Sequence, residues 1–252
     1  MLDLTIAESK WLFASCILLS SLLAFLPAIY RIEQPKRPGL LCAKAFSAGV
    51  FLGAALMHML QESIIDFHMQ GIEFPTATLL AGTTFLTLLW LEHLGQALSL
   101  HQDQSDPSIA LLATLMLCFH SIFEGAALGS EITMASSLII FSAIIAHKWA
   151  ASFALACHLA DTKLSKAKIY SYLSLFALST PATLLLVYYE LDVTSSPLLS
   201  PICNAMAAGT FLYIGTLHGL NQAVMIERCC NLKQFIFVII GFLTMAALAV
   251  WV

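Results

Sequence analysis

Charged residues are scarce in this sequence: they make up 10% of the 252 residues, whereas 60% are hydrophobic. A soluble globular domain carries about 25% charged residues, because a surface in contact with water needs polar cover. The composition therefore excludes a soluble globular fold. A long basic run is also missing and the net charge is −4, so nucleic acid is not an expected partner.

Cysteine patterns typical of metal sites or disulfide frameworks are missing too. The seven cysteines show no CxxC spacing and most lie in apolar stretches, so we expect them to be packing residues. A cleavable signal peptide is not evident, because the leader before Trp11 is short and acidic. We therefore expect the first apolar block to be a transmembrane span.

The apolar residues fall in blocks of about 20, the length that an α-helix needs to cross about 30 Å of hydrocarbon. The ten-residue alternation of a membrane β-barrel is not seen. We expect one transporter domain over residues 1–252, an all-α integral membrane protein with eight transmembrane helices. The expected spans are 11–30, 40–60, 77–98, 109–128, 132–159, 169–189, 198–220 and 234–252.

Lysine and arginine are concentrated in the first, fifth and seventh connections between these spans. Basic connections stay on the cytoplasmic side of a membrane, so we expect both termini to be extracytoplasmic. Acidic residues gather on the opposite side, where they would raise the local concentration of cations. The basic residues are Arg31, Lys36 and Arg37, then Lys163, Lys166 and Lys168, and finally Arg228 and Lys233.

Ionisable residues occur inside the expected spans, although each costs about 2.5–3.5 kcal/mol at the bilayer centre and so calls for a function. His120 and Glu124 are four residues apart, on one face of the fourth span. His147 in the fifth span would supply a third ligand. Imidazole and carboxylate suit zinc, ferrous iron, manganese and cadmium. Three protein ligands leave an open position, which favours an ion that must leave again.

Lys148 directly follows His147. If its ammonium group lies close to the carboxylate of Glu124, it fills the place of a second metal ion and leaves a one-metal site. The alternative is that Lys148 reaches toward a membrane interface. The remaining ionisable residues of interest in the spans are His58, Glu62, Glu92 and His218.

The run from His120 to Gly129 (HSIFEGAALG) resembles the fourth-helix signature of the ZIP (Zrt- and Irt-like protein) metal transporters. The His147-Lys148 pair is similar to the start of the fifth-helix motif in one branch of that family. Residues 205–213 resemble its seventh helix, and residues 49–62 resemble its second. The resemblance covers all eight spans.

This resemblance implies an eight-helix bundle with both termini outside, which imports a divalent metal ion into the cytoplasm by alternating access. Spans one, four, five and six would move against spans two, three, seven and eight. The transport site would consist of His120, Glu124 and His147. Ser121 and Lys148 fall at second-metal positions and suit a second metal poorly. His58, Glu62 and Glu92 would line the outer approach, and His218 stands where relatives often have Glu.

Zinc is the expected substrate, and an iron or manganese importer or a metal-selective channel of the same fold are the alternatives. An intramembrane metalloprotease would need His-Glu-x-x-His, which the sequence lacks. A haem-carrying bundle would need facing histidine pairs, and histidine with glutamate fits a metal ion better. The protein is therefore expected not to be an enzyme and to hold no resident cofactor. Its expected partners are the metal ion and the lipid bilayer, and the sequence does not decide whether the protein forms a homodimer. The plasma membrane is the default location.

Overall fold

The computed structural model describes residues 5–32, 39–98, 107–160, 162, 164–190, 197–225 and 232–250, and their secondary structure is all helical. Two π-helical segments, η1 (Ala54–Met59) and η3 (Ile214–Met225), continue α-helices without a break. The α-helices are α1 (Ile6–Ile32), α2 (Gly39–Gly53), α3 (Leu60–Met69), α4 (Thr76–Leu98), α5 (Pro107–Ser130), α6 (Met134–Ala160), α7 (Lys166–Glu190), α8 (Leu199–Tyr213) and α9 (Leu232–Leu248).

Since η1 joins α2 to α3 and η3 extends α8, the described residues form eight continuous helical segments. Six of them are long and apolar enough to cross a membrane, and α9 is a shorter apolar helix. The expectation of an all-α, multi-pass membrane protein is thereby confirmed. The six spans are Ile6–Leu26, Leu41–Met69, Thr76–Gly95, Leu111–Ser130, Met134–Ala160 and Lys166–Glu190.

The second helical segment is longer than the expected span 40–60. It continues through η1 and α3 to Met69 and ends before Gly71, whose φ of +77° suits glycine. Glu62 and Asp66 lie on this continuation, which is packed against α8. Ser63 of α3 is buried, and its hydroxyl donates a hydrogen bond of 2.7 Å to the carbonyl oxygen of Pro201.

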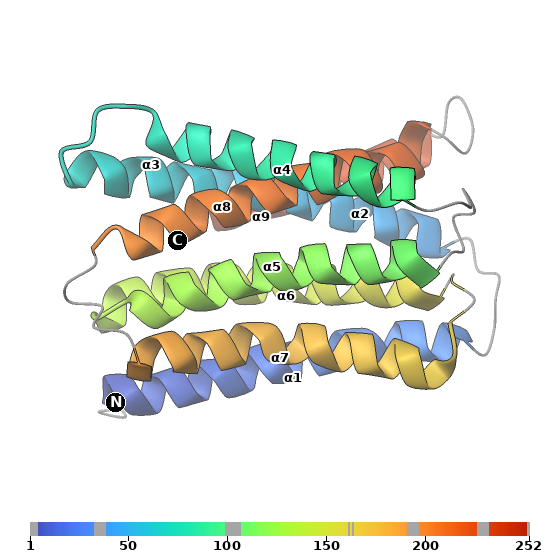
Figure 1. Ribbon diagram of the computed structural model, residues 1–252, viewed down its shortest axis with the longest axis horizontal. Helices are drawn as coiled ribbons and strands as arrows, with labels where there is room; N and C mark the ends of the chain where they lie inside the picture. The colour runs from blue at the N-terminus through green and yellow to red at the C-terminus, as the bar shows by residue number, and fades with distance from the viewer. Residues whose placement is uncertain are drawn as a thin grey trace.

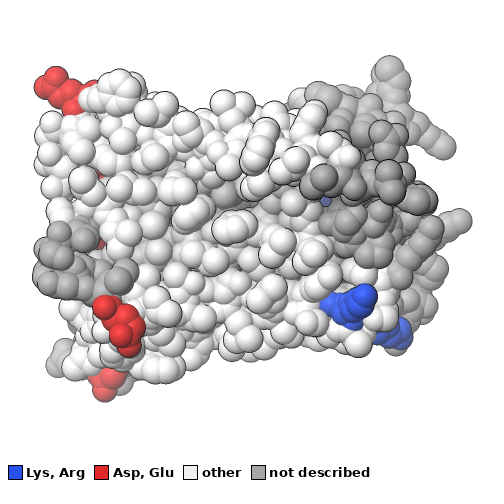
Figure 2. Space-filling model, in the orientation of Figure 1, with Lys and Arg blue, Asp and Glu red and all other residues white. Residues whose placement is uncertain are grey.

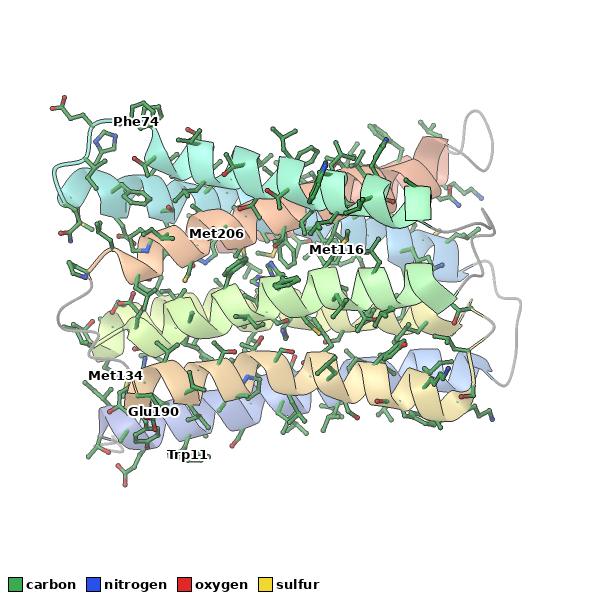
Figure 3. The ribbon with its side chains drawn as sticks, viewed as in Figure 1. Trp11, Phe74, Met116, Met134, Glu190 and Met206 are labelled. Carbon is green, nitrogen blue, oxygen red and sulfur yellow. The ribbon has the colours of Figure 1, made fainter. Side chains whose placement is uncertain are left out.

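The helices form two groups (Figure 1). In the first, called the α5 group, α5 packs on α7 and α1 packs on α6 and α7. In the second, called the α8 group, α2 packs on α9, while α3 and α4 pack on α8. The two groups meet chiefly where α5 contacts α8 and α2 contacts α6. Met116 of α5 lies at this interface (Figure 3), buried with Leu88 of α4 and Tyr213 of α8.

Glycine allows α5 to approach α7 closely. A Cβ atom on Gly125 would lie 2.6 Å from the carbonyl oxygen of Thr180, and one on Gly129 would lie 2.7 Å from that of Leu184. Side chains at these positions would push the helices apart. Close packing through small residues is how membrane helices associate when no water drives them together.

The two ends of the bundle differ in charge (Figure 2). We call the end with Glu73, Glu131 and Glu190 the acidic end; it carries the α3–α4 turn, the start of α6 and the end of α7. The opposite, basic end carries Lys166 and Lys168 at the start of α7. The start of α1 and the end of α9 lie toward the acidic end (Figure 1). This distribution is the one expected if the basic end faces the cytoplasm.

Candidate metal site

The structure brings His120 and Glu124 of α5 together with His147 of α6. Each offers one ligand atom, and these atoms all lie within 4.8 Å of one another. Nε2 of His120 is 2.9 Å from Oε1 of Glu124, and Nε2 of His147 contacts the same oxygen. Both histidines are fully buried and Glu124 is 2% exposed. Two imidazole nitrogens and a carboxylate oxygen therefore converge on one enclosed point.

The depth of this cluster follows from the helices that carry it. His120 lies ten residues before the end of α5 at Ser130, and His147 lies thirteen residues after the start of α6 at Met134. Both of those helix termini are at the acidic end. With 1.5 Å of rise per residue, the ligands lie about 15–20 Å below it, near the middle of a hydrocarbon core of about 30 Å.

Lys148 is fully buried beside the second oxygen of Glu124. Its Nζ lies 3.1 Å from Oε2 of Glu124 and donates hydrogen bonds of 2.7 Å to the hydroxyls of Ser121 and Thr180. It also lies 4.3 Å from the centre of the Phe176 ring. Lys148 therefore does not reach for an interface. The hydroxyl of Ser121 accepts a hydrogen bond from this ammonium group.

The far side of His120 contacts α8. Nδ1 of His120 lies 2.6 Å from Oγ1 of Thr210 and 3.2 Å from the carbonyl oxygen of Ala207. The ring of Phe211 stacks on His120, with centroids 3.5 Å apart, and meets His147 edge-on at 5.0 Å. Sequence reasoning missed Thr210 and Phe211 as neighbours of the site. The only signal was that both fall in the stretch that resembles the seventh ZIP helix.

His58, Glu62 and Asn204 form a polar group between the site and the acidic end. Nε2 of His58 on η1 is 3.5 Å from Oε2 of Glu62 on α3. The amide of Asn204 on α8 donates a hydrogen bond of 3.3 Å to the same oxygen. His58 is in a π-helical turn, a local distortion that is frequent at functional sites. This group has the position expected of an approach to the site.

Glu92, which was expected to line the outer approach together with His58 and Glu62, lies at a different depth from Glu62. Glu62 lies seven residues before the end of α3, about 10 Å from the acidic end. Glu92 lies sixteen residues after the start of α4, about 24 Å from the same end. Because α3 and α4 are antiparallel, the two carboxylates lie on opposite sides of the buried cluster.

Glu92 instead contacts His218, the fourth expected pathway residue. Oε1 of Glu92 is 3.6 Å from Nε2 of His218 on η3. The hydroxyl of Tyr213 donates to Oε2 of Glu92 and lies 3.2 Å from Nε2 of His218. Tyr213 is fully buried at the point where α8 becomes π-helical. Polar groups therefore lie on both sides of the central cluster along the helix axes.

The chain is also similar in sequence to known proteins. The sequence profile of the family described as "ZIP Zinc transporter" matches residues 4–108 and 99–249. The chain is 26% identical over 254 residues to zinc transporter ZIP1 of Takifugu rubripes, with 81% of this chain and 82% of that protein covered. It is 27% identical over 261 residues to zinc transporter ZIP2 of Homo sapiens, with 81% and 83% covered. Zinc transporter ZIP9-A of Xenopus laevis is 34% identical over 153 residues, which are 55% of this chain.

Proposed function

The chain belongs to the ZIP family of zinc transporters, and on this basis we propose that it imports a divalent metal ion, zinc before any other, into the cytoplasm. The observation that carries the proposal is the enclosed convergence of His120, Glu124 and His147 at mid-depth in a membrane protein. Ionisable residues at that depth are costly and are kept for function. Because the ZIP family is a family of transporters, the protein is not an enzyme.

The donor set favours zinc. Two imidazole nitrogens and one carboxylate oxygen are ligands of open zinc sites, which leave a fourth position for water or an exchanging group. An ion held in this way can enter and leave, whereas a closed set of thiolates would retain it. Iron and manganese accept the same ligands. They are alternative substrates that competition experiments separate from zinc.

The site takes one ion. Oε1 of Glu124 faces the imidazoles, whereas Oε2 is bound to the Lys148 ammonium group. Glu124 and Lys148 balance each other in charge before the ion enters. A second divalent ion would have to lie beside the ammonium group in a medium of low dielectric constant, where repulsion between like charges is strong. Lys148 therefore takes the place of a second metal ion.

The direction of transport follows from the charges at the two ends. If the acidic end lies outside, an ion attracted there meets His58 and Glu62 before the central site. It then passes Glu92 and His218 toward the basic end, which faces the cytoplasm. We take residues 1–252 as one transporter domain, of which the family profile matches residues 4–108 and 99–249. We take the plasma membrane as its location.

Alternating access would come from movement of the α5 group against the α8 group. Close packing at Gly125 and Gly129 joins α5 to α7. The Lys148 ammonium group of α6 donates hydrogen bonds to Ser121 of α5 and Thr180 of α7, and so joins α6 to both helices. The ligands on α5 and α6 therefore belong to one packed unit. The cluster is closed to solvent in this conformation. Access from either end needs a shift between the groups, and this requirement favours a carrier over an open channel.

Uptake of radiolabelled zinc into proteoliposomes tests the proposal. Wild-type protein and His68→Ala, which changes an exposed histidine at the end of α3, should give saturable uptake. His120→Ala should give the uptake of empty liposomes. Unlabelled iron, manganese and cadmium then rank the substrates by competition. Uptake that rises without saturation would indicate a channel, and unchanged uptake in His120→Ala would contradict the site.

A further inference from the structure

His120 is held on both sides of its imidazole ring. Nε2 faces Glu124, while Nδ1 faces the hydroxyl of Thr210 and the carbonyl oxygen of Ala207 on α8. All three polar contacts are buried. The ring of Phe211, the residue after Thr210, lies parallel to the imidazole and limits its rotation. The orientation of this one ligand is therefore determined by α8 as much as by its own helix.

The hydrogen-bond donors and acceptors determine which nitrogen carries the proton. The hydroxyl of Thr210 donates its single hydrogen to the carbonyl oxygen of Ala207 at 2.6 Å. Its oxygen is then left to accept at Nδ1 of His120. The Ala207 carbonyl can also only accept. Nδ1 of His120 must therefore carry a hydrogen. Nε2, the atom that points to the cluster, is then the nitrogen whose lone pair binds a metal ion once the ion replaces the hydrogen that Nε2 shares with Glu124.

His147 lacks such support. Its Nε2 also contacts Glu124, but its Nδ1 is buried without a hydrogen-bond partner among the residues that the structure describes. The two imidazoles of the cluster are thus unequal. Only His120 has its ring plane and its tautomer fixed by a neighbouring group, and that group belongs to the other set of helices.

We infer that Thr210 is a positioning residue for metal binding, which acts through His120 to present Nε2 as a ligand. This inference rests on the proposed function. Outer hydrogen bonds to a metal-binding imidazole fix its tautomer and orientation, and their loss typically costs about 10–100-fold in metal affinity. Thr210 makes no contact with the ligand atoms of Glu124 or His147, so its effect passes through His120 alone.

The location of Thr210 gives this contact a second consequence. His120 belongs to the α5 group and Thr210 to the α8 group, so a shift between the groups breaks the Nδ1 hydrogen bond. His120 then loses the support that fixes its tautomer. The site is well formed only when α5 and α8 are in the register seen here, and it weakens once they have moved. A carrier needs such a change in affinity in order to release its ion.

Three variants test this role. Thr210→Val keeps the shape of the side chain but removes the hydroxyl, whereas Thr210→Ser keeps the hydroxyl. Thr216→Val is the matched control, because the Thr216 hydroxyl bonds within its own helix to the carbonyl oxygen of Leu212. For each protein we would measure zinc uptake against zinc concentration in proteoliposomes. Equilibrium binding of zinc to the purified protein in detergent gives a second, independent readout.

Thr210→Val should raise both KM and the dissociation constant for zinc about tenfold, with little change in the maximal rate. Thr210→Ser and Thr216→Val should match the wild type. A wild-type KM in Thr210→Val, an equal loss in Thr210→Ser, or a fall in maximal rate alone would overturn the inference. If Thr210→Val does not fold, a tenfold difference between Thr210→Ala and Thr210→Ser serves the same purpose. Absence of uptake by the wild type would count against the proposed function, and the binding measurement would still decide the role of Thr210.

Discussion

Nζ of Lys148 lies 3.1 Å from Oε2 of Glu124, on the side of the carboxylate away from the two imidazoles. One carboxylate thus serves two different partners: an ammonium group at one oxygen and a pair of histidines at the other. Ser121 and Thr180 complete the surroundings of the ammonium group. This division explains how a buried glutamate remains available to a metal ion in the absence of water.

Removal of the ammonium group should make the protein depend on zinc for stability. Lys148→Met leaves the Glu124 carboxylate buried without its partner, and the loss of one member of a buried ion pair costs about 3–5 kcal/mol. We expect the metal-free variant to unfold at a lower temperature than the wild type. Bound zinc replaces the missing charge, so zinc should raise the unfolding temperature of the variant more than that of the wild type.

Thermal unfolding in detergent, with and without zinc, measures both effects. Lys166→Met is the control, since Lys166 is exposed at the start of α7. An equal response to zinc in Lys148→Met and in the wild type would contradict the function assigned to this lysine.

The contact between α5 and α7 should not tolerate a methyl group. A Cβ at Gly125 would lie 2.6 Å from the carbonyl oxygen of Thr180, a backbone atom that cannot turn aside. Overpacking of this kind costs about 1–3 kcal/mol. It would also displace the Thr180 hydroxyl from Lys148. We expect Gly125→Ala to lower both the unfolding temperature and the rate of zinc uptake.

Gly82→Ala supplies the comparison, because nothing lies within 4 Å of a Cβ at Gly82. This substitution also replaces glycine by alanine within a membrane helix, but it should leave stability and uptake unchanged. Similar behaviour of the two variants would show that the close approach of α5 and α7 has no bearing on transport.

A second buried lysine should stabilise the acidic end of the α5 group. Lys10 of α1 is fully buried and donates to the carbonyl oxygen of Leu128, near the end of α5, and to the hydroxyl of Ser137 on α6 at 3.0 Å. The last carbonyl groups of a helix lack partners within it. Lys10→Met would leave the Leu128 carbonyl unsatisfied, at a cost of about 1–3 kcal/mol.

Thermal unfolding again provides the measurement, and Lys168→Met at the exposed start of α7 is the control. We expect Lys10→Met to unfold at a lower temperature than either the wild type or the control. If its unfolding temperature equals theirs, the hydrogen bonds of Lys10 do not hold the three helices together.

Local sequence patterns predicted the parts of the site that depend on a single helix. His120 and Glu124 share one face because they are four residues apart, and the cost of burying charge marked them as functional. The length of the apolar blocks likewise predicted an all-α protein that crosses the membrane several times. The position of Lys148 beside Glu124 was one of two alternatives, and the contact between α5 and α6 decides between them.

Contacts between distant helices could not be predicted in this way. Thr210 and His120 are ninety positions apart, and neither residue by itself indicates the hydrogen bond between them. The depth of Glu92 relative to Glu62 could not be predicted either, because the direction of α4 determines it. The second helical segment also runs past the expected end of its span at residue 60, because α3 continues to Met69 as a helix packed against α8.

Glu124 provides the most direct test of the proposed transport site. Zinc uptake into proteoliposomes would be compared for the wild type, Glu124→Gln and Glu73→Gln, after each has been shown to insert in equal amount. Glu124→Gln removes the charge with little change in shape, whereas Glu73 is exposed at the acidic end. We predict saturable uptake by the wild type and by Glu73→Gln, and none above empty liposomes by Glu124→Gln. Wild-type uptake by Glu124→Gln would contradict the assignment of the buried cluster as the site through which the ion passes.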